Sequence, residues 1–256
     1  MRKFWNRLVG MPDPSNGRPR LTWAERPAVI YAIGDVHGCL DVLKRLEALI
    51  AADAANYPGD KMIVMLGDYI DRGPKSAQVL DWLMRPAPTG FARICLAGNH
   101  EAMFLDAMAQ PDRCGDWLQW GGRQTLESYR IDVNEFDAAS TARRRALLQA
   151  SVPDEHRSFL TGLPVLLEVP GALFVHAGVR GDLALEQQRD ADLQWMREPF
   201  LSTPVPGFPV VVHGHTPSPL PEILPWRIGV DTQAYATGKM TAVRLLRDGP
   251  PEFIQT

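Results

Sequence analysis

The hydrophobic positions of the first hundred residues follow two alternating patterns. Short, largely apolar runs of strand length stop each time at a glycine, at residues 28–33, 62–66 and 91–97. Each run is followed by a segment expected to be helical, at residues 40–55, 76–84 and from 101 onward. This alternation predicts parallel strands joined by right-handed crossovers, as in an α/β domain.

The middle and the end of the chain follow different patterns. Helices are expected at about 116–128, 138–150 and 154–161, with no strand between them. Strands then resume, mostly joined by short turns rich in proline and glycine, at residues 165–169, 172–175, 210–212, 228–230 and 240–245. We therefore predict one α/β domain over residues 28–256, with a helical insertion at about 111–162.

Composition excludes several classes of protein. The 256 residues are 45% apolar and 22% charged, as in an ordinary folded domain, and no apolar run is long enough to predict a membrane span. A net charge of −3 argues against a nucleic-acid-binding protein. The three cysteines form no Cys-x-x-Cys pair, so neither a disulfide framework nor a thiolate zinc site is expected. The predicted location is the cytoplasm.

Residues 1–27 differ from the rest and are interpreted as a basic N-terminal arm. Residues 1–26 carry six basic and two acidic side chains, a net charge of +4, which leaves −7 for the remainder. Between Arg7 and Gly10 only Leu8 and Val9 are apolar, too few for the hydrophobic segment of a signal peptide. We expect a flexible arm that does not direct export.

Candidate chemistry is concentrated where the predicted strands end. Polar motifs rich in glycine follow five of the strands: Gly34-Asp35-Val36-His37-Gly38, Gly67-Asp68-Tyr69-Ile70-Asp71-Arg72-Gly73, Gly98-Asn99-His100-Glu101, His176-Ala177-Gly178 and His213-Gly214-His215-Thr216. A single Gly-Asp pair is typical of a turn. However, the carboxyl ends of parallel strands meet at one edge of a sheet, and ligands bind there. The repetition therefore predicts a cluster of oxygen and nitrogen metal ligands.

Together these motifs resemble the phosphoprotein phosphatase branch of the calcineurin-like metallophosphoesterases, particularly the bacterial and lambda-phage type of serine/threonine phosphatase. The resemblance runs from about Val29 to Leu245. It implies a four-layer α/β/β/α sandwich with a helical cap, and a site for two divalent metal ions between the strand ends. Because the ligand set holds no thiolate, Mn²⁺, Fe and Zn²⁺ all suit it and copper(I) does not. Mn²⁺ is the expected metal, although the ligands themselves do not distinguish among the three.

The resemblance also implies which residues hold the two metals. Asp68 would bridge both ions, since two neighbouring cations need shared negative charge. Asp35 and His37 would complete the first metal site. The second metal would be held, besides Asp68, by Asn99, His176 and His215.

The remaining matching residues imply a catalyst. By resemblance, His100 donates a proton to the leaving group and Asp71 orients His100. Arg72 and Asn99 would bind the phosphate group, for which a planar guanidinium is well suited. A second phosphate-binding arginine is expected at Arg197, because Trp195-Met196-Arg197 resembles a Trp-x-Arg segment of the family.

The implied reaction is hydrolysis of a phosphoester by a hydroxide that bridges two metals, without a phosphoenzyme. Phosphoserine and phosphothreonine in proteins are the leading substrates. The enzymatic alternative is a dinucleoside-polyphosphate hydrolase, which acts on diadenosine tetraphosphate; that branch tends to carry Ala in place of Asp71 and Asp in place of Glu101. A non-catalytic scaffold is a third alternative, and the retained His100, Asp71 and Arg72 argue against it.

Three residues near the motifs have no assigned role in binding or chemistry. His213 lies two positions before His215 and could point the same way. Cys39 directly follows Gly38 and is interpreted as a packing residue. Gln233 stands where related bacterial proteins have glycine, which puts the local turn in doubt but leaves every predicted ligand intact.

Overall fold

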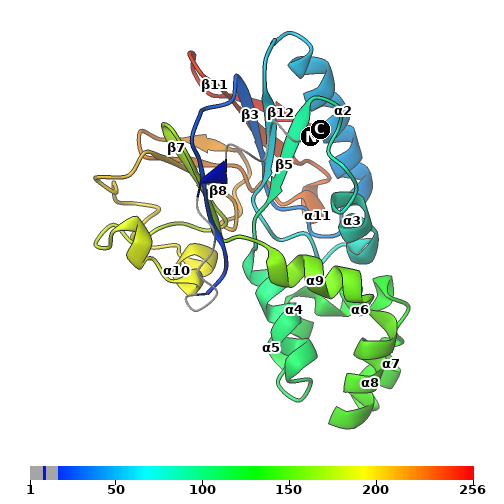
Figure 1. Cartoon of the computed structure of the whole chain (residues 1–256). Coiled ribbons are helices and arrows are strands. Elements are labelled where there is room, and N and C mark those ends of the chain that lie inside the picture. Colours follow the sequence, from blue (N-terminus) through cyan, green and yellow to red (C-terminus); the bar gives the residue numbers. More distant parts are fainter. Residues whose placement is uncertain (1–7, 10–16) are drawn as a thin grey trace.

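Two β-sheets packed face to face form the centre of the molecule (Figure 1). The computed structural model describes residues 8–9 and 17–256. Within these residues, the strand order is β12-β11-β3-β4-β5 in one sheet and β1-β2-β6-β7-β8-β10-β9 in the other. The predicted α/β class, with two sheets and flanking helices, is confirmed.

The five-stranded sheet contains the three strands expected at the start of the chain. It is built from β3 (Val29–Ile33), β4 (Lys61–Met65), β5 (Phe91–Cys95), β11 (Thr241–Leu246) and β12 (Glu252–Gln255). β3, β4 and β5 are parallel, whereas β11 runs antiparallel to β3. Helices α2 (Leu40–Ala54) and α3 (Ser76–Leu83) connect the parallel strands and cover the outer face of the sheet (Figure 1).

The seven-stranded sheet is formed mainly by the second half of the chain. Its strands are β1 (Leu8–Val9), β2 (Arg20–Trp23), β6 (Leu166–Val169), β7 (Ala172–Val175), β8 (Val210–His213), β9 (Glu222–Ile223) and β10 (Arg227–Gly229). Short helices η3 (Leu185–Gln187) and α10 (Asp190–Trp195) lie between β7 and β8, and α11 (Ala234–Thr237) lies between β10 and β11 of the other sheet. Since β7, β8 and β10 are parallel to one another, the loops after β7 and β8 open at the same edge of this sheet.

Alternation of side chains along the strands divides the core into two layers. On β3, Ile30 and Ala32 point between the two sheets, where they join Phe174 of β7. Tyr31 and Ile33 point the other way, toward α2 and α3. All five are fully buried, and burying a side chain of the size of isoleucine or phenylalanine contributes about 1.5–3 kcal/mol. The unbroken apolar runs of the sequence therefore reflect strands that are covered on both faces.

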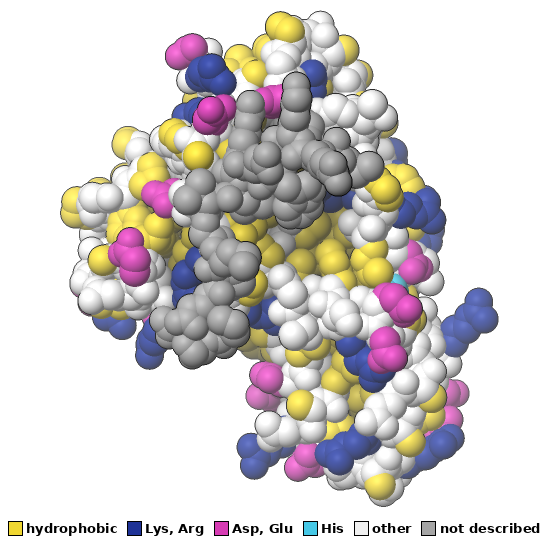
Figure 2. Space-filling model, in the orientation of Figure 1, with side chains coloured by type: hydrophobic (Ala, Val, Ile, Leu, Met, Phe, Trp, Pro, Cys, Tyr) yellow, Lys and Arg dark blue, Asp and Glu magenta, His cyan; other side chains and the backbone are white. Residues whose placement is uncertain are grey.

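The region between β5 and β6 is entirely helical. It contains α4 (Asn99–Ala109), α5 (Gly115–Trp117), η2 (Leu118–Gly122), α6 (Arg123–Ser128), α7 (Val133–Ala138), α8 (Thr141–Ser151) and α9 (Asp154–Gly162). The expected helix at 138–150 begins later, because Ser140 caps the N-terminus of α8 through the backbone of Arg143. On the face shown in Figure 2, this helical lobe carries both basic and acidic side chains.

The expectation of a flexible basic arm does not hold for residues 17–27. β2 pairs in parallel with β6 and in antiparallel fashion with β1, so it extends the seven-stranded sheet. The Arg20 guanidinium binds Asp190 at 2.7 Å, and Arg18 donates to the carbonyl oxygens of Leu160 and Leu163. The basic residues of this segment are therefore used to attach it to the fold. Apart from Leu8 and Val9 of β1, the rest of the predicted arm lies outside the described residues.

No helix among the described residues is long and apolar enough to cross a membrane.

Candidate functional site

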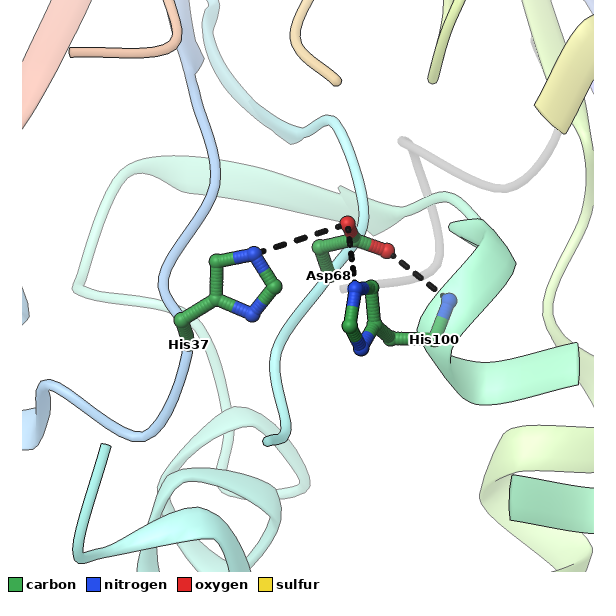
Figure 3. Close-up of side chains that lie close together, drawn as sticks. All are labelled: His37, Asp68 and His100. Atoms are coloured by element: carbon green, nitrogen blue, oxygen red, sulfur yellow. Dashed lines mark hydrogen bonds and ion pairs between the residues drawn. The ribbon is translucent and has the colours of Figure 1, made fainter. Parts of the chain in front are cut away.

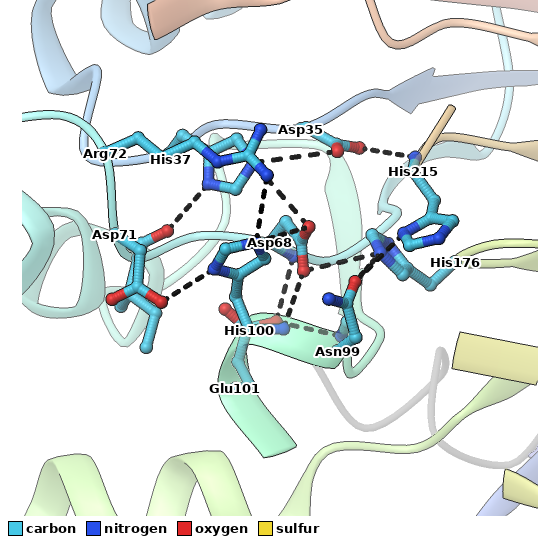
Figure 4. A network of polar contacts seen from close by, with 12 residues as sticks. Asp35, His37, Asp68, Asp71, Arg72, Asn99, His100, Glu101, His176 and His215 are labelled. Carbon is cyan, nitrogen blue, oxygen red and sulfur yellow. Dashed lines mark hydrogen bonds and ion pairs between the residues drawn. The ribbon is translucent and has the colours of Figure 1, made fainter. Parts of the chain in front are cut away.

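The loops that follow the strands bring the predicted site residues, apart from Arg197, together in one place (Figure 4). Five of them have a positive φ angle, which is uncommon for residues other than glycine: His37 (43°), Asp68 (52°), Asp71 (70°), Arg72 (65°) and His215 (61°). Such backbone conformations cost free energy and persist only where the surrounding structure holds them. Their concentration in these loops marks the site as a specialised region of the fold.

Asp68 lies at the centre of the cluster. Its carboxylate is 3.6 Å from Nε2 of His37 and 3.3 Å from Nε2 of His176, on opposite sides. His100 approaches the same carboxylate, with Nε2 at 3.8 Å from Oδ2 and its backbone N–H donating to Oδ1 (Figure 3). Burial alone would raise the pKa of Asp68, but the charges of His176 and His100 outweigh burial and lower it well below its usual range. Asp68 is therefore an ionised carboxylate shared by two groups of side chains.

Asp35 and Asn99 complete the two groups. Asp35 accepts the backbone N–H of His215 at 3.1 Å and lies 3.9 Å from Nε2 of His37. The side-chain oxygen of Asn99 lies 2.9 Å from Nε2 of His176 and 3.0 Å from Nδ1 of His215. The six side chains predicted to hold metal thus lie together, in two groups that meet at Asp68.

The orientation of the histidines fits bound cations. Nδ1 of His37 lies 2.8 Å from the carbonyl oxygen of Ile70, so Nδ1 carries the proton and Nε2 keeps its lone pair. That Nε2 atom is buried and has no hydrogen-bond partner among the described residues. Nδ1 of His176 is fixed in the same way, at 2.9 Å from the carbonyl oxygen of Leu66. Metal-ligating histidines typically have their second ring nitrogen fixed by such a partner.

The charge balance of the cluster also favours cations. Burial lowers the pKa of His37 to about 3, so this imidazole is neutral and able to act as a ligand. Burial opposes charge on His176 as well, yet the neighbouring Asp68 raises its pKa to about 9. Asp35, whose carboxylate is fully buried, has a raised pKa because of burial and the nearby charges of Asp231 and Asp68. The excess of carboxylates is what divalent ions would neutralise.

His100 and Asp71 form a buried pair beside the cluster. Nδ1 of His100 lies 2.7 Å from Oδ2 of Asp71. The same carboxylate accepts hydrogen bonds from Nε1 of Trp117 at 2.9 Å and from the hydroxyl of Thr125 at 2.5 Å. Burial alone would lower the pKa of His100, but the charges of Asp68 and Asp71 outweigh burial and raise it. The imidazole is therefore held in one orientation and favours its protonated form.

Arg72 lies beside the His100–Asp71 pair. Its Nη2 atom lies 3.3 Å from Nε2 of His100, and its guanidinium stacks 4.8 Å from the ring centroid of Tyr235. The backbone N–H of Arg72 donates to the carbonyl oxygen of Gly121 at 3.1 Å. Gly121 has a φ of 110°, and a Cβ there would lie 2.5 Å from the Arg72 nitrogen. The helical insertion thus helps to set the position of this arginine.

Arg197 is the least integrated of the predicted site residues. It follows α10 and is exposed. Burial lowers the pKa of His215 to about 3, and the charge of Arg197 is among those that lower it further. The guanidinium is therefore near the second group of ligands, without a hydrogen bond to another described site residue.

The three residues without an assigned role lie outside the cluster of ligands. His213 is buried, with Nδ1 at 3.0 Å from the carbonyl oxygen of Gly214 and its ring 5.1 Å from that of Phe200. Cys39 donates to the carbonyl oxygen of His37, and burial raises the pKa of its thiol to about 11, which makes it unreactive. Gln233 keeps the turn by adopting a left-handed conformation, with φ 57° and ψ 53°.

Sequence reasoning missed the side chains that support the site. Glu101 is fully buried and accepts the backbone N–H groups of Asp68, Tyr69 and Gly98 at 2.7–2.9 Å, which ties two loops together. A Cβ on Gly98 would collide with the Asp68 carboxylate. Trp117 and Thr125 lie 46 and 54 residues from Asp71 in the chain. The sequence placed Glu101 in the Gly98-Asn99-His100-Glu101 motif but gave no sign of this structural role.

The sequence is similar to proteins with more than one named activity. A family model of the calcineurin-like phosphoesterases matches residues 28–254. The asymmetrical bis(5'-nucleosyl)-tetraphosphatase PrpE of Anoxybacillus flavithermus is 24% identical over 233 residues, which cover 83% of this chain and 88% of that protein. Serine/threonine-protein phosphatase 2 of Escherichia coli is 38% identical over 109 residues, which cover 42% of this chain and 43% of that protein.

Solved structures show the same fold at lower sequence identity. A candidate diadenosine tetraphosphatase aligns over 91% of this chain and 96% of its own, with a TM-score of 0.65 and 20% identity. The cold-active protein-tyrosine phosphatase of a Shewanella species aligns over 96% of this chain and 89% of its own, with a TM-score of 0.55 and 19% identity. The family model spans nearly all of the described sequence, and the chain therefore belongs to the calcineurin-like phosphoesterases.

Proposed function

We propose that this phosphoesterase is a metal-dependent phosphatase that acts on phosphoserine and phosphothreonine in proteins. The observation that carries this proposal is the buried His100–Asp71 pair, joined at 2.7 Å beside the candidate metal ligands. A histidine held in this way is a general acid, and a general acid is needed when the leaving oxygen is strongly basic. Serine and threonine alkoxides are leaving groups of that kind.

Two divalent cations fit the residues present. We assign the first to Asp35, His37 and Asp68, and the second to Asp68, Asn99, His176 and His215. When bound, such ions lower the pKa of water, polarise the phosphoryl group and neutralise its charge. The oxygen and imidazole ligands suit Mn²⁺, Fe or Zn²⁺, and we expect Mn²⁺ to support activity.

The chain's own residues would bind the phosphoryl group and handle the proton. Arg72 and Arg197 approach from the open side and offer guanidinium forks to the phosphoryl oxygens. His100 gives the proton on Nε2 to the departing oxygen, because Nδ1 is engaged by Asp71. Arg72 lies 3.3 Å from that Nε2 atom, so the phosphoryl group and the donor are presented side by side. Asp71 stabilises the charged imidazole before the transfer.

Hydrolysis of a dinucleoside polyphosphate is the second candidate. It is supported by the similarity to the bis(5'-nucleosyl)-tetraphosphatase of Anoxybacillus flavithermus, in which the match covers 88% of that protein. The leaving group in that reaction is a nucleotide phosphate, which departs as a stable anion and needs less help from an acid. The fully buried Asp71, with three side-chain donors around its carboxylate, favours the more demanding reaction.

A direct comparison of substrates tests the proposal. The purified chain, loaded with Mn²⁺, is given a phosphothreonine peptide and diadenosine tetraphosphate in parallel, with Asp68→Asn as the control for contaminating phosphatases. We expect a higher kcat/KM for the peptide. A preference of tenfold or more for the dinucleotide would replace the proposal by the second candidate. Full metal binding without turnover of any phosphoester would indicate a non-catalytic scaffold.

A further inference from the structure

A hollow of about 530 Å³ opens next to the proposed proton donor. It is lined by the exposed side of α4, by the turn formed by α5 and η2, and by the end of α10. Figure 1 shows α4, α5 and α10 in the lower part of the molecule. The side chains that give the hollow its chemical character are Trp120, Trp195, Asp106, Asp116, Gln110 and Arg113.

The two tryptophans connect the hollow to the site. The ring of Trp120 lies 6.5 Å from that of His100, and the ring of Trp195 lies 6.0 Å from that of His215. Trp117, which donates to Asp71, lines the hollow as well. If His100 protonates the oxygen of the leaving group, the part of the substrate beyond that oxygen lies near His100, and Trp120 is the exposed aromatic ring beside it. The hollow is therefore in the position of a leaving-group subsite.

The size and aromatic character of the hollow indicate a large partner. Trp120 and Trp195 are 44% and 39% exposed, unusually high for tryptophan next to a buried site. Their rings meet edge to face, with centroids 5.6 Å apart and planes at 65°, so no flat group fits between them. Each ring instead offers one open face. The side chain of serine or threonine alone is too small to fill such a space, so a neighbouring residue of the substrate must enter it.

The charge of the hollow indicates which kind of chemical group it can bind. Its charged lining is Asp106, Asp116 and Arg113, a net charge of −1. Asp116 precedes Trp120 by four positions in continuous helical turns, which places the two side chains on one face. Asp116 forms no hydrogen bond or ion pair with another residue of the described chain. A polyphosphate leaving group would be repelled by these carboxylates, whereas a cation would be attracted.

An arginine side chain satisfies both features of the hollow. Its planar guanidinium stacks on an indole face and at the same time forms paired hydrogen bonds with a carboxylate. We propose that this hollow, with Asp116 and the open face of Trp120 in its wall, binds an arginine located within a few residues of the phosphorylated serine or threonine. The inference rests on the proposed protein phosphatase function and adds a sequence preference to it.

Matched peptides test this subsite. Each phosphothreonine peptide of the first set carries a single arginine, and its position varies among the peptides from three residues before to three residues after the phosphothreonine. In a second, otherwise identical set, citrulline replaces the arginine. Citrulline is nearly the same shape as arginine, but it is uncharged and has a carbonyl oxygen in place of one terminal NH₂ group. At one position or more, we expect the arginine peptide to have about tenfold higher kcat/KM. In Asp116→Asn and Trp120→Ala, the arginine and citrulline peptides should be hydrolysed with equal kcat/KM. Trp120→Phe should retain part of the preference for arginine. Asp112→Asn, at a residue outside the hollow, should retain all of it.

The possible failures of this test are distinguishable. If both peptide sets are hydrolysed efficiently at equal rates, the subsite is refuted while the phosphatase function stands. A preference for arginine that remains in both Asp116→Asn and Trp120→Ala also refutes the subsite, because the arginine is then bound by other residues. If no phosphopeptide is hydrolysed although diadenosine tetraphosphate is, the proposed function itself is wrong and the subsite falls with it.

Discussion

Replacement of Asp71 by asparagine tests the proton donor without removing it. In the native chain the Asp71 carboxylate accepts from His100, Trp117 and Thr125 and is fully buried. Asparagine has the same shape but only one acceptor oxygen, and its NH₂ group would face at least one of these donors. The variant therefore weakens the hold on His100 and removes the charge that stabilises its protonated form.

The expected loss follows from the strength of that contact. A hydrogen bond to a charged group contributes about 1.5–3 kcal/mol, and each 1.36 kcal/mol corresponds to a factor of ten in rate. We therefore expect kcat for a phosphothreonine peptide to fall about 10- to 100-fold. The fall should be much smaller for p-nitrophenyl phosphate, because its leaving group departs without a proton.

The pH profile gives a second readout of the same change. Asp71 and Asp68 together raise the pKa of His100, so the acid form persists to a higher pH than in a free imidazole. Without the charge of Asp71 this pKa falls, and the alkaline limb of the peptide reaction should move to lower pH. Asp81→Asn, which breaks the Asp81–His156 pair away from the site, is the matched control. Equal losses on both substrates, or an unmoved alkaline limb, would refute the role of Asp71.

Three further changes test the supporting structure. His215→Ala should weaken or abolish the binding of one metal and abolish activity, whereas His213→Ala should leave the metal content near normal. Equal loss of metal in both variants, measured by elemental analysis, would contradict the assignment. Glu101→Gln should destabilise the fold by about 1–3 kcal/mol, seen as a lower thermal midpoint, because buried backbone N–H groups lose their acceptor; an unchanged midpoint would show that the loops hold without it. Gly121→Ala should raise KM by displacing Arg72, while Gly162→Ala, whose Cβ meets nothing within 4 Å, should not.

The elements that the sequence predicted well are those whose pattern depends on local burial. The strand at 28–33 and the helix at 40–55 are found as Val29–Ile33 and Leu40–Ala54, since their apolar spacing directly reflects which faces are covered. β12 was missed because Glu252–Gln255 is a short edge strand with an exposed first residue, and such strands carry little apolar pattern. β2 was hidden for a similar reason among the basic residues of the N-terminal segment.

The residues of the candidate site can likewise be divided into those that the sequence could place and those that it could not. Asp35, Asp68 and Asn99 could be placed together because parallel strands must present their carboxyl ends at one edge. The support of Asp71 by Trp117 and Thr125 could not be predicted, because these contacts depend on how the helical insertion folds back onto the sheet. The direction of His213 also required the structure, since only the packing against Phe200 shows that its ring turns away.

The metal content and turnover of His100→Asn show whether His100 is a proton donor or a metal ligand. His100 lies close enough to His37 and Asp68 to complete a group of three potential ligands, whereas the account here makes it the proton donor. We expect the variant to keep about two metals per chain and to lose about 10²- to 10⁴-fold in turnover of a phosphothreonine peptide. A variant that loses a metal, or one that keeps its activity on the peptide, would contradict the account.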